Sequence, residues 1–237
     1  MKKSILTLAL LGALSSSAFA QGLIFFSGGA AASTRISTNT TAGGATSSTQ
    51  LTGTGGSYYY ALFASVGNAN INGSTAAVNG TSANYVFNNL SGWTLVGIAQ
   101  STASLGRFGA ISQGNASGNQ TALNGDGSLT VQGIGGGSSV HTVTVGWNST
   151  TGGTTLASLI SWYNAGSTPG WIGQSAVGSG IALGDGALVG TPNAFGTGAG
   201  QVGGYLVGLT TVAVPEPGTM VLAGLGGLAM LGLRRKK

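Results

Sequence analysis

The sequence predicts a mainly β protein, with an antiparallel, jelly-roll-like β-sandwich as its body and one hydrophobic helix at its C-terminus. Three observations lead to this class. The 237 residues include 46 glycines and are rich in Ser, Thr, Asn and Ala, a composition that disfavours long helices. Short runs of Val, Ile, Tyr, Phe and Trp recur between Gly- and Asn-rich turns, which is typical of strands. The absence of cysteine means that stability must come from a packed core or bound partners.

Residues 1–20 have the three parts of a secretory signal peptide. Lys2 and Lys3 form a positively charged start, and residues 5–14 form an apolar stretch. Ala18 and Ala20 occupy the small-residue positions before a cleavage site. We therefore expect export, with Gln21 as the first residue of the mature protein.

Residues 21–213 form the expected extracellular body, which is long enough for one domain with its own core. Apolar runs predict strands over residues 23–26, 58–66, 84–90, 93–99, 128–134, 140–147, 156–163 and 205–214. The Ser-, Thr- and Gly-rich residues 27–57 predict a polar loop or a frayed sheet edge. A β-solenoid is the alternative fold, because Gly125–Leu129 and Gly184–Leu188 are similar in sequence.

Three Asn-Gly dipeptides suit type I′ hairpin turns, because both residue types tolerate positive φ. They are Asn72-Gly73, Asn79-Gly80 and Asn124-Gly125. We expect each of them to connect two strands.

The formal net charge of +5 comes from the two ends of the chain. Within the body, Arg35 and Arg107 balance Asp126 and Asp185. A nucleic-acid-binding protein would need basic residues clustered on its folded surface. The sequence therefore excludes nucleic acid as a partner.

The body offers few groups for catalysis or metal binding, so we expect no enzyme activity, no metal and no cofactor. His141 lies in an alternating stretch and is predicted to be a surface or capped strand residue. Asp126 and Asp185 each lie between glycines and are predicted to be turn residues. The segment Gly198–Gly203 matches the dinucleotide-binding fingerprint, but no strand–helix unit surrounds it and the glycine content explains it.

Two residue types of the body, tryptophan and asparagine, are relevant to sugar binding and to glycosylation. The four tryptophans are expected to be core residues for the most part, with one exposed sugar-stacking platform as the alternative. They are Trp93, Trp147, Trp162 and Trp171. Asn-x-Ser/Thr sequons occur at Asn39, Asn72, Asn79, Asn89, Asn115, Asn119 and Asn148, and they can be glycosylated only if the host has the transferase.

Residues 214–237 differ in kind from the body. Pro215 and Pro217 cannot continue a helix and favour an extended, accessible strip. Residues 219–233 carry no charge and predict a helix of about 22 Å, short for a hydrocarbon core of about 30 Å. The chain ends in a basic cluster that would stay on the cytoplasmic side, namely Arg234, Arg235, Lys236 and Lys237.

This order of features resembles the PEP-CTERM sorting tail of exported Gram-negative proteins. The motif that carries the resemblance is Val214, Pro215, Glu216, Pro217 and Gly218, followed by the apolar helix and the basic end. The resemblance implies recognition and cleavage by an exosortase after transient anchoring in the inner membrane. It also implies delivery to the cell surface or to an exopolysaccharide matrix, with Glu216 as a feature of the substrate and not as a catalytic residue.

Together these features predict an exported, non-enzymatic structural protein of the cell surface or of a biofilm matrix. Its expected partners are an exosortase and exopolysaccharide. The alternative is a carbohydrate-binding adhesin with a defined site.

Overall fold

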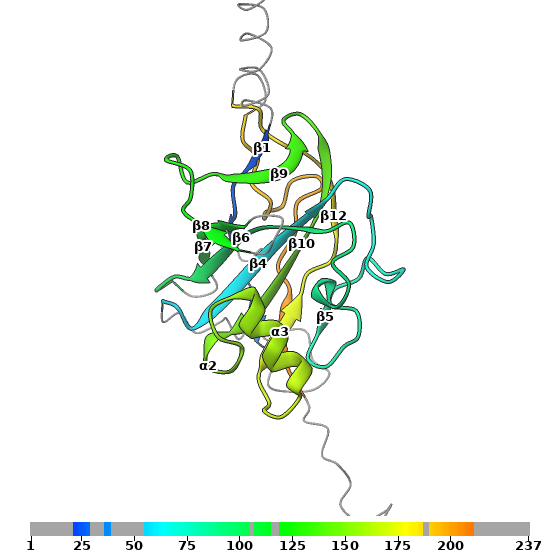
Figure 1. Ribbon diagram of the computed structural model, residues 1–237, viewed down its shortest axis with the longest axis vertical. Coiled ribbons are helices and arrows are strands. Elements are labelled where there is room, and N and C mark those ends of the chain that lie inside the picture. The colour runs from blue at the N-terminus through cyan, green and yellow to red at the C-terminus, as the bar shows by residue number, and fades with distance from the viewer. Residues whose placement is uncertain are drawn as a thin grey trace, which may run out of the picture.

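Two β-sheets of unequal size build the body of the protein (Figure 1). The computed structural model describes residues 21–28, 36–38, 55–104, 107–114, 119–186 and 190–210. One sheet has 11 strands and the other has 2. The prediction of a mainly β protein is thus confirmed, while the predicted C-terminal helix at 219–233 lies outside the described residues.

The strands differ widely in length. The long ones are β4 (Tyr58–Ser65), β6 (Thr94–Ser101), β7 (Phe108–Gly114), β9 (Leu129–Gly135) and β10 (Ser139–Asn148). The shorter ones are β1 (Gln21–Ile24), β2 (Ser27–Gly28), β3 (Ser37–Thr38), β5 (Val78–Asn79), β8 (Gln120–Thr121), β11 (Trp171–Gln174), β12 (Gly178–Ala182) and β13 (Leu206–Leu209). The helical segments are η3 (Val86–Asn88), α2 (Ser149–Gly152) and α3 (Leu156–Ala165).

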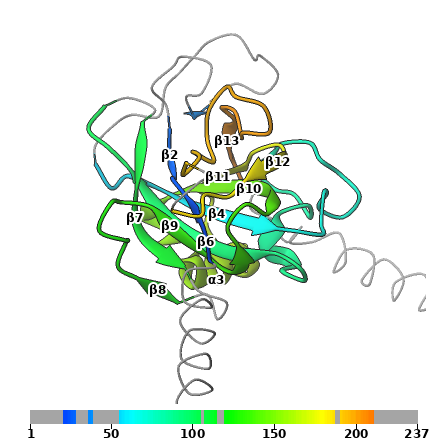
Figure 2. The same cartoon turned by 90° about the horizontal axis from the view of Figure 1, so that it is seen from above.

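The large sheet follows the path β2-β7-β6-β4-β10-β11-β13-β3, and Figure 2 labels these strands from β2 to β13. Strands β12, β5 and β8 pair with β10, β11 and β7 beside this path. The pairing of β13 with β3 is parallel, and the other pairings between the named strands are antiparallel. The small sheet pairs β1 with β9.

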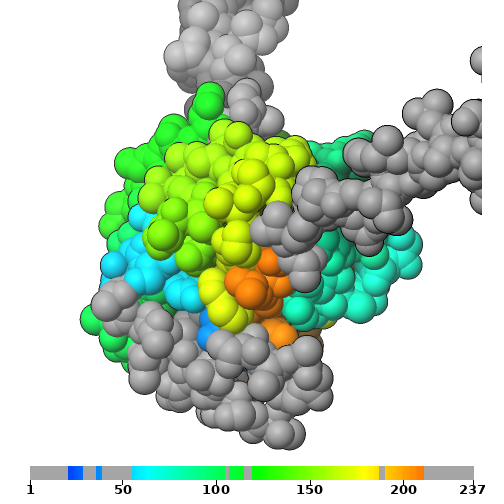
Figure 3. All heavy atoms as spheres, turned by 90° about the horizontal axis from the view of Figure 1, so that it is seen from below, coloured from blue at the N-terminus to red at the C-terminus, as the bar shows by residue number. Residues whose placement is uncertain are grey.

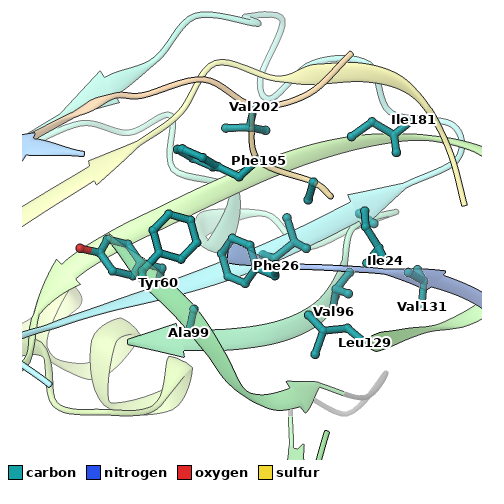
Figure 4. Packing of buried hydrophobic residues seen from close by; sticks show 14 of the residues in the cluster. Ile24, Phe26, Tyr60, Val96, Ala99, Leu129, Val131, Ile181, Phe195 and Val202 are labelled. Carbon is teal, nitrogen blue, oxygen red and sulfur yellow. The ribbon is translucent and has the colours of Figure 1, made fainter. Parts of the chain in front are cut away.

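Both faces of the central strands are buried: β4 is apolar along nearly its whole length, and β10 buries Thr142 and Thr144 among its valines. One face of β4 places Tyr60 and Leu62 in a first core, together with residues of β1, β6, β9 and the segment 181–207. Figure 4 shows Ile24 and Phe26 of the N-terminal segment among Val96, Leu129 and other members of this core. The small sheet and the C-terminal segment therefore cover this face of the large sheet.

The opposite face carries a second core. Phe63 of β4 and Trp147 of β10 lie there, covered by Leu159 and Trp162 of α3 and by the segment around η3. Trp147 is fully buried, and its indole N–H donates to the carbonyl of Gly153 at 2.8 Å. The helical segments thus act as the second cover of the sheet.

The predicted strand 156–163 is wrong, because this segment forms α3. Thr155 and Ser158 make a reciprocal capping box, and Gly166 ends the helix with φ of 58°. Leu156, Leu159 and Trp162 are its buried residues, at a spacing of three that matches one face of a helix. The capping residues outweigh the strand preference of the apolar ones.

The predicted strand 84–90 is also wrong. Tyr85, Val86 and Phe87 all belong to the second core, whereas a strand would place the middle residue on the opposite face. Tyr85 stacks on Phe87 at 5.1 Å between ring centroids. The buried amide of Gln174 bonds the backbone here, accepting from Val86 N at 2.7 Å and donating to Asn84 O at 3.0 Å. These bonds replace a strand ladder, so the segment forms the 3-10 turn η3.

One of the three predicted Asn-Gly hairpin turns is confirmed. Asn72 and Gly73 have φ of 50° and 81°, and Ile71 and Ser74 exchange both backbone hydrogen bonds across them. At Asn79-Gly80 only the glycine has positive φ. Asn79 belongs to β5, where it pairs with Gly173 of β11. At residues 124–128 the positive φ belongs to Gly127, and Asn124 begins a longer turn.

The apolar runs did not predict β7, β11 and β12, which are interrupted by glycine and polar residues. Within residues 27–57, the described parts form β2 and β3 at the two ends of the strand path. Short edge strands of this kind limit edge-to-edge pairing with other chains.

Candidate functional site

The predicted sorting residues Val214–Gly218 and Arg234–Lys237 lie outside the described residues, as do Ala18 and Ala20. Gln21, the predicted first mature residue, is exposed at the start of β1. In the ranges that the structure describes, no helix is both long and apolar enough to cross a membrane.

The described chain ends at a firmly held residue, Thr210. Its backbone N–H donates to the carbonyl of Gly170 at 2.8 Å, and its hydroxyl accepts from the N–H of Gly170 at 2.9 Å. Figure 3 shows the orange residues of this region at the surface, beside the yellow residues that lead into β11. In the sequence, three residues separate Thr210 from Val214, the first residue of the sorting motif.

Two ionisable residues of the body, Asp126 and His141, lie in a turn and in a strand. Asp126 accepts hydrogen bonds from the N–H and the hydroxyl of Ser128 at 2.9 and 2.6 Å, and these bonds lower the pKa of its carboxyl. It is therefore a turn residue, as predicted. His141 is half-buried on β10 opposite Ser65 and Ser179. The described residues contain no group of three or more His, Cys, Asp or Glu that could hold a metal ion.

The tryptophans are mainly core residues, as expected. Trp93, Trp147 and Trp162 are buried, and Trp171 is half-buried against the first core. Trp93 also lines a cavity.

This cavity has a volume of about 280 Å³ and lies between two loops. The first loop, residues 68–73, follows β4, and the second, residues 89–93, leads into β6. Its lining consists of Asn68, Asn70, Ile71, Asn72, Gly73, Asn89, Ser91 and Trp93. None of these side chains ionises, so the cavity is polar and uncharged.

The first loop is held by its own hydrogen bonds. The type I′ turn at Asn72-Gly73 fixes its tip, and Ile71 is buried in the second core. The side-chain oxygen of Asn70 accepts from the N–H of Gly73 at 3.2 Å. Asn72 donates its side-chain N–H to Ala83 O at 3.4 Å. The loop therefore has a defined shape.

The second loop is held in a similar way and is tied to the first. Asn89 accepts from the N–H of Ser91 at 3.2 Å through its side-chain oxygen. Asn68 donates its side-chain N–H to the carbonyl of Ser91 at 2.8 Å. Gly92, with φ of 74°, allows this approach, because an added Cβ would collide with the amide of Asn68. Both the positive φ and the contact with Asn68 therefore favour glycine at 92.

The sequence singles out Trp93, Asn72 and Asn89, but it did not predict that they line one cavity. Asn72 was noted as a turn residue and a sequon, and Asn89 as a sequon. The signal that was available is the asparagine at every second position from 68 to 72.

Comparison with known proteins gives a match only for the tail. A family model described as the PEP-CTERM protein-sorting motif matches residues 213–236. No curated protein and no solved structure matches the chain. The match includes the predicted motif, the apolar stretch and most of the basic end, and it supports export and exosortase-type sorting at the membrane of a Gram-negative bacterium. The chain therefore carries a C-terminal PEP-CTERM protein-sorting motif, consistent with an exosortase substrate.

Proposed function

We propose that the mature protein is a structural component of the cell surface or of an exopolysaccharide matrix, where it supports biofilm formation without catalysing a reaction. The observation that carries the proposal is the sorting motif at residues 213–236. The motif accounts for export and for release from the membrane, and the body is what remains after processing.

The composition of the body supports a matrix role. Its surface offers many hydroxyl and amide groups and few charges, since the charged residues of the chain lie mostly in its two ends. Hydroxyl and amide groups form hydrogen bonds with polysaccharide hydroxyls without charge pairing. The two buried cores give the body a fixed surface.

The test combines cell fractionation with intact-mass measurement of the recovered protein. We expect the mature protein in the surface or matrix fraction, without residues 1–20 and without the segment after the sorting motif. The double variant Pro215→Ala/Glu216→Ala is expected to stay uncut in the membrane fraction. A mature protein found wholly as free periplasmic protein contradicts the proposal.

A carbohydrate-binding adhesin is the second candidate function. The observation that favours it is the uncharged cavity with Trp93 and several asparagines in its lining. The two candidates differ in one respect: an adhesin needs a specific site, whereas a matrix component can act through many weak contacts.

A further inference from the structure

We propose that the cavity between residues 68–73 and 89–93, here called the asparagine cavity, binds an uncharged sugar unit of a polysaccharide. The choice of a polysaccharide rests on the proposed function. The assignment of the site and of its ligand class rests on the lining, the hydrogen bonds and the size of the cavity.

The asparagines have unused hydrogen-bonding groups. Each uses one end of its side-chain amide to hold the two loops, as described above. The other ends make no hydrogen bond to any residue that the structure describes: the oxygens of Asn68 and Asn72 and the NH₂ groups of Asn70 and Asn89. Two acceptors and two donors are therefore available on groups whose positions are fixed. A vicinal pair of sugar hydroxyls can donate and accept in the same way.

The apolar part of the lining consists of Trp93 and Ile71. Trp93 and Ile71 are 7% and 4% exposed and belong to the second core, so they are rigid. Little of either side chain is exposed, so they form a rigid floor and the amides supply most of the contacts to the sugar hydroxyls. Two of the large hydrophobic residues exposed among the described ones, Val66 and Leu90, lie in or next to the same loops in the sequence, at 58% and 39% exposure.

Size and charge define the ligand further. A volume of about 280 Å³ is at the low end of the roughly 300–1,000 Å³ that small-molecule sites have, so the cavity accepts about one or two sugar units. Without a cation in the lining, a uronate or a sulfate would lose hydration and gain no opposite charge in return. We therefore expect neutral sugars to bind and acidic sugars to bind more weakly.

The test uses the mature protein recovered from its cells. Binding is measured by calorimetry with neutral glucose, galactose and mannose oligosaccharides of one to six units, and with uronic-acid oligosaccharides of equal length. We expect binding of at least one neutral series, with an affinity that stops rising after about two units. The absence of binding to every neutral series, or a preference for the acidic ones, overturns the proposal.

The deciding variant is Asn70→Asp/Asn89→Asp. Each substitution keeps the side-chain oxygen that holds its loop, removes the free NH₂ group and adds almost no volume. Loss of two ordinary hydrogen bonds predicts an affinity lower by about tenfold or more. The matched control, Asn79→Asp/Asn164→Asp, adds the same charge at two exposed asparagines outside the cavity lining.

The control should bind like the unchanged protein, and both variants should keep its melting temperature. Equal binding by the deciding variant and the control overturns the assignment of the site. A covalent glycan on Asn72 or Asn89 in the intact mass overturns reversible binding, because it would occupy the cavity. A protein found in the matrix that binds no neutral sugar overturns this inference alone, whereas a sugar-binding protein that stays periplasmic overturns only the proposed delivery.

Discussion

Removal of the Tyr60 hydroxyl is expected to stabilise the protein. Tyr60 is fully buried in the first core and lies 4.8 Å from Phe108 between ring centroids. Its hydroxyl is buried and has no hydrogen-bond partner among the residues that the structure describes. Tyr60→Phe keeps the ring and its contacts, so the substitution removes only the cost of the unpaired hydroxyl. That cost is about 1–3 kcal/mol.

Tyr85→Phe is the matched control, and it is expected to lower the stability of the protein. Tyr85 is also fully buried, but its hydroxyl donates to the carbonyl of Gly80 at 2.8 Å. Tyr85→Phe removes the same atom and leaves a buried carbonyl without this donor, which we expect to cost about 1–3 kcal/mol. The two variants should therefore differ from each other by several kcal/mol, although both are the same change of residue type.

Urea unfolding at neutral pH measures the effect. The transition midpoint should rise for Tyr60→Phe and fall for Tyr85→Phe, with an unchanged slope in both. For a domain of this size, each 1 kcal/mol corresponds to about 2–4 °C in melting temperature. A loss of stability in Tyr60→Phe as large as that in Tyr85→Phe would show that the Tyr60 hydroxyl is paired and would refute the reasoning.

Further predictions concern pH, a helix cap and one glycine. Burial raises the pKa of the Tyr60, Tyr85 and Tyr205 hydroxyls, so these hydroxyls lose their protons at a higher pH in the folded state than in the unfolded state. Their contribution to stability is complete below pH 10 and falls above it by about 1.4 kcal/mol per pH unit for each tyrosine, which alkaline unfolding curves of single Phe variants will measure. Thr155→Ala removes the cap of α3 and should cost about 1 kcal/mol in urea unfolding, whereas Thr154→Ala at the exposed neighbouring position should cost little. Gly92→Ala should cost about 1–2 kcal/mol and weaken sugar binding, since it strains the backbone and displaces Asn68; a variant as stable as the unchanged protein contradicts this.

The sequence predicts the central strands well because they are rich in β-branched, aromatic and other apolar residues. Residues 58–66, 93–99 and 140–147 all lie where the structure has β4, β6 and β10. The two wrong strands have two separate causes. Residues 156–163 are apolar, but the capping groups of Thr155, Ser158 and Gly166 decide their conformation. Residues 84–90 depend on Gln174, which comes from a distant part of the chain. A local apolar pattern cannot contain that information.

The asparagine cavity could not be predicted from a local sequence pattern either. Its two loops are about twenty residues apart in the sequence, and each alone resembles an ordinary polar turn. They meet because β4 pairs with β6, with Ala64 opposite Thr94, so that the chain leaving β4 and the chain entering β6 lie side by side. The type I′ turn was predictable from Asn72-Gly73, and the need for glycine at 92 was not, since it arises only when Asn68 reaches Ser91. A search for sites in such low-charge chains therefore has to begin with strand pairing, because the pairing decides which of the many asparagines share one surface.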